Sequence, residues 1–131
     1  APWIRGARLA SALNAAMLPG VRFEAVRFTP RAAPYAREAC EGVRLVLTDR
    51  ARFEAVHTGV EIAQKLIALH KGSYESERLE RLFGHTKVTA AVRSGVPFRT
   101  IAASMDAEVR AFREKRERYL LYPVDPCGAA P

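Results

Sequence analysis

The stretch LPGVRFEAVRFT, residues 18–29, decides the fold class. Its first three residues, 18–20, end a helical pattern, because proline disrupts helix continuation and glycine suits the turn after it. Apolar and charged residues then alternate over residues 21–25, as they do in a strand that is buried on one face. At Val26 and Phe28 the apolar phase changes, which favours either a bulge or a strand covered on both faces.

The segments on either side of this junction complete an α+β pattern. Residues 6–18 carry leucines at four-residue spacing among alanines, which predicts an amphipathic helix. Residues 42–48 predict a second strand with Leu45 and Leu47 turned inward. The intervening residues 30–41 form a long loop, and loops of this length in a compact domain often carry function.

The carboxy-terminal half is predicted to be helical. A helix that begins at His57 or Thr58 and runs to about Lys71 has a wide apolar face. Glycine and proline divide the rest of this half into shorter helices at residues 77–83, 86–94 and 98–104, and a last helix at 105–118 has Met105, Val109 and Phe112 on its buried side. The predicted fold is a small sheet of two or three strands packed against several helices, with one domain over residues 1–123 and a flexible tail at 124–131.

Length and composition agree with a single globular domain. The chain has 131 residues, of which 49% are hydrophobic and 27% charged, so it can bury a core of its own. No apolar stretch approaches the ~20 residues that cross a bilayer. Because the sequence starts at Ala1 without an initiator methionine or a signal-peptide core, we expect further polypeptide upstream. Whether the parent protein is cytoplasmic or exported depends on that upstream sequence.

The net charge of +7 raises the possibility of a stand-alone basic module that binds nucleic acid or an anionic polymer. Such a module needs its cations on one surface. The basic residues are instead spread along the chain between acids, and only residues 110–118 form a dense group. A charged run on one helix is more often a solvated face, which argues against nucleic acid.

Few residues could carry chemistry within the chain itself. Asp49 follows a strand, where it could reach a cleft, although capping the turn and pairing with Arg50 is the simpler role. Cys40 could be a nucleophile beside a histidine, but a buried structural thiol is the commoner case. A Cys40–Cys127 disulfide is not expected, because Cys127 lies in the tail. The three histidines lack metal-ligand spacing, and we expect neither a metal nor a cofactor. A self-contained enzyme is therefore the function class with the least support.

Several phrases, taken in order, carry a resemblance to one family. They are PWI at 2–4, LPGVRF at 18–23, FTP at 28–30, CEGV at 40–43, TDRARF at 48–53, RLFG at 81–84 and YLLY at 119–122. Together they resemble the carboxy-terminal domain of bacterial exo-β-N-acetylmuramidases, a family long catalogued as of unknown function. The resemblance extends over nearly the whole chain.

The resemblance implies a function for a longer protein. In that family a larger amino-terminal Rossmann-like domain carries the catalytic carboxylate, and the cleft lies at its junction with the smaller domain. The whole enzyme releases N-acetylmuramic acid from the non-reducing ends of peptidoglycan fragments. This chain would then be an accessory domain that forms one wall of the cleft for the muramyl sugar and cannot hydrolyse alone.

The same resemblance implies substrate-binding residues in two loops, which are Thr29, Pro30, Thr48, Asp49 and Arg50. Tyr35, in the first loop, is added to them as an aromatic residue that could stack on a sugar. An arginine such as Arg50 suits a sugar-linked carboxylate, because the guanidinium makes charge-assisted bonds. Among the tyrosines, Tyr35, Tyr74 and Tyr122 are candidates for stacking on a sugar, with packing as the alternative. The chain departs from the family pattern at Ala33-Pro34, where a Ser-Lys pair is common, and at Glu41, where a glycine is usual.

Overall fold

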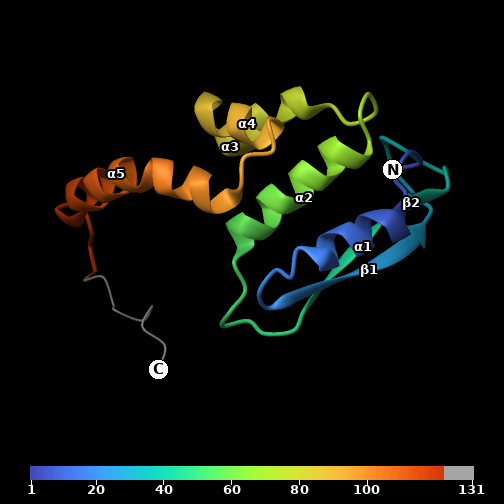
Figure 1. The fold of residues 1–131 in the computed structure, drawn as a ribbon, viewed down its shortest axis with the longest axis horizontal. Helices are drawn as coiled ribbons and strands as arrows, with labels where there is room; N and C mark the ends of the chain where they lie inside the picture. Colours follow the sequence, from blue (N-terminus) through green and yellow to red (C-terminus); the bar gives the residue numbers. More distant parts are fainter. Residues whose placement is uncertain (123–131) are drawn as a thin grey trace.

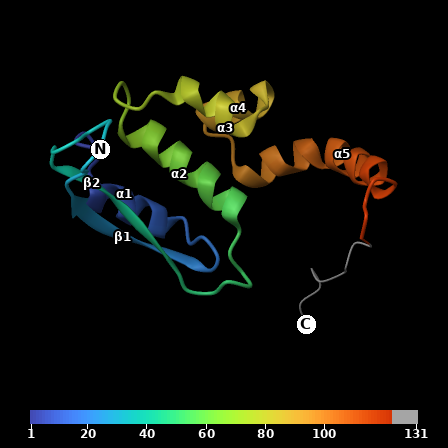
Figure 2. The same ribbon diagram turned by 180° about the vertical axis from the view of Figure 1, so that it is seen from behind.

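The computed structural model describes residues 1–122 as a two-stranded sheet and a series of helices (Figures 1 and 2). In order, the elements are α1 (Gly6–Ala15), β1 (Val21–Phe28), β2 (Cys40–Leu47), α2 (Ala55–Leu69), the 3-10 turn η1 (Ser76–Arg78), α3 (Leu79–Phe83), α4 (Thr86–Arg93) and α5 (Phe98–Glu117). The predicted α+β class and the helical carboxy-terminal half are confirmed. The predicted tail and Cys127 lie outside the described residues.

The two strands form a regular antiparallel hairpin. Pairing runs without interruption from Val21 opposite Leu47 to Phe28 opposite Cys40. The bulge that the change of apolar phase suggested is therefore wrong. Val26 and Phe28 instead lie on the face away from α1, where Val26 is half-buried and Phe28 is 48% exposed. This second face is only partly covered, so the alternative of a strand buried on both faces is wrong as well.

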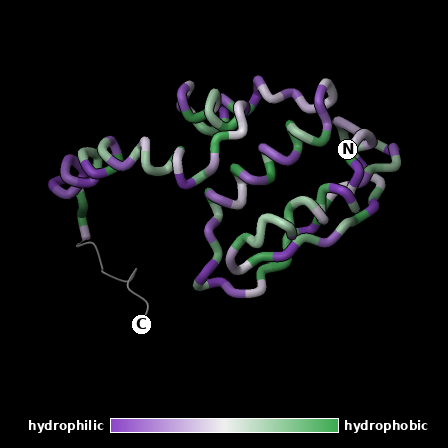
Figure 3. The backbone as a smooth tube through the Cα atoms, in the orientation of Figure 1, coloured by the Kyte–Doolittle hydropathy of each residue, from purple (hydrophilic) through white to green (hydrophobic). Residues whose placement is uncertain are grey.

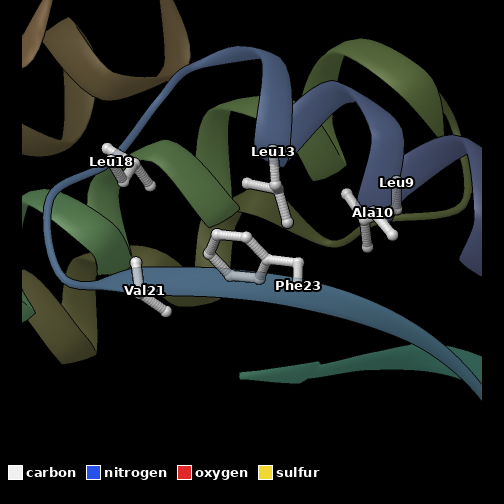
Figure 4. Packing of buried hydrophobic residues seen from close by; sticks show 6 residues of the cluster. All are labelled: Leu9, Ala10, Leu13, Leu18, Val21 and Phe23. Carbon is white, nitrogen blue, oxygen red and sulfur yellow. The ribbon is translucent and has the colours of Figure 1, made fainter. Parts of the chain in front are cut away.

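Helix α1 lies across the other face of the hairpin and forms the first core with it. Leu9 and Leu13 point toward the sheet, where Phe23 of β1 meets them (Figure 4). Leu13 is fully buried, and truncating such a leucine to alanine costs about 2–5 kcal/mol. Asn14 adds a polar clamp, because its amide donates to the Phe23 carbonyl at 2.9 Å and accepts from the Phe23 N–H at 2.9 Å.

Close backbone contacts hold α1 to the hairpin at both ends. A Cβ added to Gly6, at the start of α1, would lie 2.7 Å from the carbonyl oxygen of Gly42 in β2. Gly20 precedes β1 with φ of 69°, and a Cβ there would lie 2.2 Å from the Asp49 carbonyl oxygen. Only glycine fits where the backbones approach so closely. The ends of β2 are thereby fixed relative to the helix.

Helix α2 is shared between two cores, as its wide apolar face predicted. Its residues Ile62, Leu66 and Leu69 pack against the first core, which α1 and β1 build. On another side, Val60 and Ala63 join the second core, which also contains Leu79, Val92 and Ile101 from the later helices. The helix begins at Ala55, slightly before the predicted start, and places Thr58 in its buried part.

Helix α5 differs most from the prediction. It is one helix of 20 residues, whereas the sequence suggested separate helices at 98–104 and 105–118. Its first part packs on the molecule through Phe98 and Ile101, and its far half extends away from the other helices (Figures 1 and 2). Val109 and Phe112, predicted to be buried, are 41% and 62% exposed. Figure 3 shows this far half as mainly hydrophilic, so it has little to bury.

Two residues of β2 are also more exposed than predicted. Leu45 and Leu47 were expected to point into the core, but their exposed fractions are 43% and 45%. Both lie on the same face as Phe23, their neighbour across the hairpin, by the alternation of the strand. Helix α1 covers the β1 side of this face and leaves the outer part of β2 open.

Candidate functional site

The six residues that the sequence singled out fall into two groups at opposite ends of the hairpin. Thr29, Pro30 and Tyr35 lie in the loop between β1 and β2, whereas Thr48, Asp49 and Arg50 follow the far end of β2. Strands of eight residues separate these ends by roughly 23 Å at about 3.3 Å per residue. One sugar cannot contact both groups.

At the end of β2, Asp49 serves the turn. Its Oδ1 accepts hydrogen bonds from the N–H groups of Ala51 at 2.9 Å and Arg52 at 3.3 Å. The Thr48 and Asp49 N–H groups donate to the Gly20 carbonyl. The simpler role of Asp49, a turn cap, is confirmed, but its expected pairing with Arg50 is not observed. Arg50 is exposed and forms no ion pair with any residue from 1 to 122.

At the opposite end, Tyr35 belongs to an aromatic cluster. Its hydroxyl accepts a hydrogen bond from the indole Nε1 of Trp3 at 3.1 Å, across 32 positions of sequence. The Trp3 ring lies 5.4 Å from His70 in an edge-to-face arrangement and 6.2 Å from Tyr74. Three separate segments, the chain start, the hairpin loop and the segment after α2, therefore meet around one indole.

Burial disfavours the charged forms of two groups in this cluster, the His70 imidazole and the Tyr74 phenol. Burial lowers the pKa of the His70 imidazole, and the positive charges of Arg8 and Arg5 lower it further. The His70 Nε2 is buried and has no hydrogen-bond partner within residues 1–122. Burial raises the pKa of the Tyr74 phenol. Tyrosine and tryptophan combine an apolar ring with a polar edge, which suits contact with amphipathic ligands.

Beside the cluster is a pocket of about 330 Å³, which is within the size range of small-molecule sites. Its walls are mostly aromatic or apolar, and they comprise Trp3, Pro34, Tyr35, Ser73, Tyr74, Glu75, Arg78, Leu79 and Leu82. Of the six predicted residues it contains Tyr35. Pro34, one of the departures from the family pattern, also lines it. We call this the aromatic pocket.

A second hollow is also lined by Trp3 and has a different chemistry. It measures about 600 Å³ and is lined by Pro2, Trp3, Ile4, Arg5, Arg27, Ala39 and Glu41. Because two guanidinium groups and one carboxylate line it, we call it the charged pocket. Because Trp3 lines both hollows, a ligand at this end of the hairpin can meet rings and cations together.

Glu41 organises the charged pocket. Its carboxylate accepts a hydrogen bond from the Gly6 N–H at 2.8 Å and pairs with Arg27 at 3.2 Å. The bond from Gly6 holds the pKa of the Glu41 carboxyl below its usual range; Arg27 and Arg5 act in the same direction and partial burial opposes them. Glu41 therefore caps the start of α1 as an anion. Arg5 forms no ion pair with any of the described residues, so its guanidinium can pair with an anionic group of a ligand.

None of these groups is arranged as a hydrolytic acid. A general acid needs a carboxyl whose pKa is raised, whereas that of Glu41 is lowered, and Glu75 of the aromatic pocket pairs with Arg78. The Cys40 thiol is 1% exposed and so is closed to a substrate. In the part of the chain that the structure describes, no three His, Cys, Asp or Glu side chains gather as metal ligands.

Sequence reasoning missed two of the residues at this end and one pair elsewhere. Trp3 is the single tryptophan and lies outside any apolar repeat, and this position could have marked it as a site residue. No feature of the sequence singles out Arg5. Between α2 and α5, His57 stacks on Phe98 at 4.4 Å, and its Nδ1 lies 3.0 Å from Glu54. The spacing of this acid and imidazole, three positions apart, was visible in the sequence.

The other predicted tyrosines lie in different places. Tyr74 lines the aromatic pocket, and Tyr122 is 81% exposed beyond the end of α5. Among residues 1–122 no helix is long and apolar enough to cross a membrane.

Comparison with known proteins gives three likenesses. The family described as exo-beta-N-acetylmuramidase NamZ, C-terminal, matches residues 1–122. The peptidoglycan beta-N-acetylmuramidase NamZ of Bacillus subtilis (strain 168) is 32% identical over 125 residues, which is 93% of this chain and 30% of that protein. The crystal structure of a DUF1343 family protein from Bacteroides fragilis NCTC 9343 aligns with a TM-score of 0.56 at 22% identity, over 93% of this chain and 34% of that one. The chain thus spans about a third of the length of these relatives.

Proposed function

This chain belongs to the family of exo-β-N-acetylmuramidase NamZ carboxy-terminal domains, and from that membership we propose that it forms one wall of the substrate cleft in a longer glycoside hydrolase. The parent enzyme would release N-acetylmuramic acid from peptidoglycan fragments. A larger amino-terminal domain would supply the catalytic carboxylate. The lack of a suitably arranged acid in the described residues of this chain supports that division.

The observation that carries the proposal is the aromatic pocket beside Trp3. Sugars offer apolar faces to aromatic rings and hydroxyl groups to hydrogen-bonding edges, and this pocket provides both through Tyr35 and Tyr74. Its volume of about 330 Å³ suits a single sugar ring. We therefore place the muramyl sugar at the end of the hairpin that contains Trp3.

The carboxylate of a muramyl sugar needs a cation, and two arginines compete for the role. Arg5 lies in the charged pocket, next to the proposed sugar, and has no ionic partner among the described residues. Arg50, the arginine expected from the sequence, lies at the other end of the hairpin. Binding of the muramyl carboxylate by Arg50, beside Thr48 and Asp49, is the alternative expected from the sequence.

The alternative of a basic module has less support. At 100° per residue, the five cations of the dense group point around the whole circumference of α5. They alternate with Glu108, Glu114 and Glu117. A phosphate backbone needs positive charge along one surface, which this helix does not offer.

The test is muramidase activity of the full-length parent protein on a chromogenic muramide. Tyr35→Ala and Tyr74→Ala should each raise KM about fivefold, because a stacked ring contributes on the order of 1 kcal/mol. We expect kcat to change little, since the reacting groups lie elsewhere. Tyr119→Ala is the matched control, as Tyr119 is 69% exposed near the end of α5.

Arg5→Ala and Arg50→Ala distinguish the two possible positions of the muramyl carboxylate. Replacing the arginine that binds the carboxylate should raise KM in the same assay, and replacing the other should not. Equal kinetics for Tyr35→Ala, Tyr74→Ala and Tyr119→Ala would contradict the pocket assignment. Hydrolysis by the isolated residues 1–131 would contradict the division of roles.

A further inference from the structure

The two edges of the hairpin are not equivalent. On β1, the Phe23 N–H and carbonyl point away from β2, and both are occupied by the Asn14 side chain at 2.9 Å. The Asn14 side chain of α1 thus occupies this edge at Phe23. An edge with unpaired N–H and carbonyl groups is a template for another strand, so β1 is protected from further pairing at Phe23.

The outer edge of β2 is open. In an antiparallel pair, successive residues point their N–H and carbonyl groups alternately toward and away from the partner strand. Since Phe23 points outward, its partner Leu45 must also point outward, and so must Val43 and Leu47. Within residues 1–122, the outward N–H and carbonyl groups of Val43, Leu45 and Leu47 have no backbone hydrogen-bond partner outside the hairpin. Their side chains are also incompletely covered, with Leu45 43% and Leu47 45% exposed.

One position on this edge already has a partner. The Ala1 nitrogen donates to the Glu41 carbonyl at 3.0 Å, and the Glu41 N–H donates to the Ala1 carbonyl at 3.2 Å. Such mutual bonding is the signature of a hydrogen-bonded pair in an antiparallel ladder. Directly after it the chain turns, with the Ile4 N–H donating to the Ala1 carbonyl at 3.2 Å.

This pair fixes a direction and a register. Residues before Ala1 that continue the ladder run antiparallel to β2, from its end back to Glu41. The residue two positions before Ala1 falls opposite Val43, the fourth opposite Leu45 and the sixth opposite Leu47. Their backbone groups would meet the open groups of β2, and their side chains would cover the exposed leucines.

We propose that the free edge of β2 pairs with the segment that directly precedes Ala1 in the full-length protein, as the third strand of an antiparallel sheet. The proposal rests on the family assignment, which makes this chain a carboxy-terminal part of a longer polypeptide. It is independent of the sugar pocket. The sheet would join the domain to its neighbour by backbone bonds, which depend little on the identity of the side chains.

The test is residue-resolved hydrogen–deuterium exchange on the full-length protein. Pairing with β1 protects the amides of Arg44 and Val46, which point inward, and these serve as internal standards. The third strand should also protect Val43, Leu45 and Leu47, about 100-fold or more relative to open amides. Protection of Arg44 and Val46 alone, in an alternating pattern, would overturn the proposal.

Proline substitutions upstream identify the occupant of the edge. Proline placed four residues before Ala1 removes the N–H that faces the Leu45 carbonyl, which should break this pair and release the protection of the Leu45 amide. Proline three residues before Ala1 removes an N–H that faces away from β2, so the Leu45 amide should stay protected. Equal effects of the two variants would refute the register. Protection that appears only at concentrations where the protein dimerises would assign the edge to a second copy and refute the proposal. None of these measurements uses muramidase activity, so a failure of the third-strand proposal can be distinguished from a failure of the proposed sugar site.

Discussion

Asn14 is the residue whose removal best tests how α1 is attached to the hairpin. The change Asn14→Ala deletes two hydrogen bonds of 2.9 Å to the Phe23 backbone. At about 1 kcal/mol each, the loss is about 2 kcal/mol. Alanine returns up to about 0.6 kcal/mol through its higher helix propensity. The net expectation is a fall of about 1.5 kcal/mol in the free energy of unfolding.

The assay is urea unfolding followed by circular dichroism, with Ser11→Ala as the matched control. Ser11 is exposed on the same helix and makes no side-chain hydrogen bond within residues 1–122. Its replacement should raise stability by a few tenths of a kcal/mol, about 0.4, through propensity alone. If Asn14→Ala unfolds within about 0.5 kcal/mol of wild type, in the range of ordinary surface changes, the clamp does not hold the helix.

A second variant at the same position tests the donor separately. Asn14→Asp keeps an acceptor for the Phe23 N–H but turns a carboxylate oxygen toward the Phe23 carbonyl. A protonated carboxyl can donate to that carbonyl, so folding should raise the pKa of the new group. Stability is then greatest below its unfolded pKa and falls as the pH rises through the folded pKa. A variant whose stability, relative to wild type, does not depend on pH would refute this account of the two bonds.

Two further predictions concern the contacts at either end of β2. Gly20→Ala should lower the free energy of unfolding by at least about 3 kcal/mol, because a Cβ would lie 2.2 Å from the Asp49 carbonyl oxygen. Gly72→Ala, also at positive φ but in open space, should lower it by about 1 kcal/mol in the same urea assay. Similar losses for the two variants would show that the close approach is not decisive. For Glu41, whose pKa is lowered on folding from an ordinary 4.5, the contribution of the charge is present above that ordinary value and is lost as the pH falls through the folded pKa. The stability difference between wild type and Glu41→Gln should therefore shrink as the pH drops below 4.5, and a difference that grows there would contradict the capping role.

Local periodicity was sufficient to predict most of the elements. The helix before Leu18, the two strands and both faces of α2 follow from spacings that involve near neighbours in the sequence. The division of α5 at residue 104 had weaker grounds, because no glycine or proline lies there. Ser104 in fact bonds its hydroxyl to the Ile101 carbonyl at 2.7 Å within a continuous helix.

The site was less predictable because it is made by distant parts of the chain. Tyr35 was singled out, but nothing in the sequence linked it to Trp3, which is 32 positions away. Nor did the sequence reveal that the loops at 29–35 and 48–50 lie at opposite ends of one hairpin, since this depends on the register of β1 and β2. Leu45 and Phe112 were assigned to a core, but both are exposed. A sequence pattern shows that a face is apolar, but it does not show which other element covers that face.

The proposed third strand offers a physical reason for the separation of the two loops. A strand antiparallel to β2 would run from the Leu47 end to Ala1 and so pass along the whole hairpin. The neighbouring domain would then approach β2 along its length, near Arg50 at one end and near Trp3 at the other. Both loops could border a single elongated cleft although no one sugar contacts both. On this arrangement, Arg50→Ala should weaken binding of longer fragments and leave a single muramide unaffected, whereas Tyr35→Ala should weaken both.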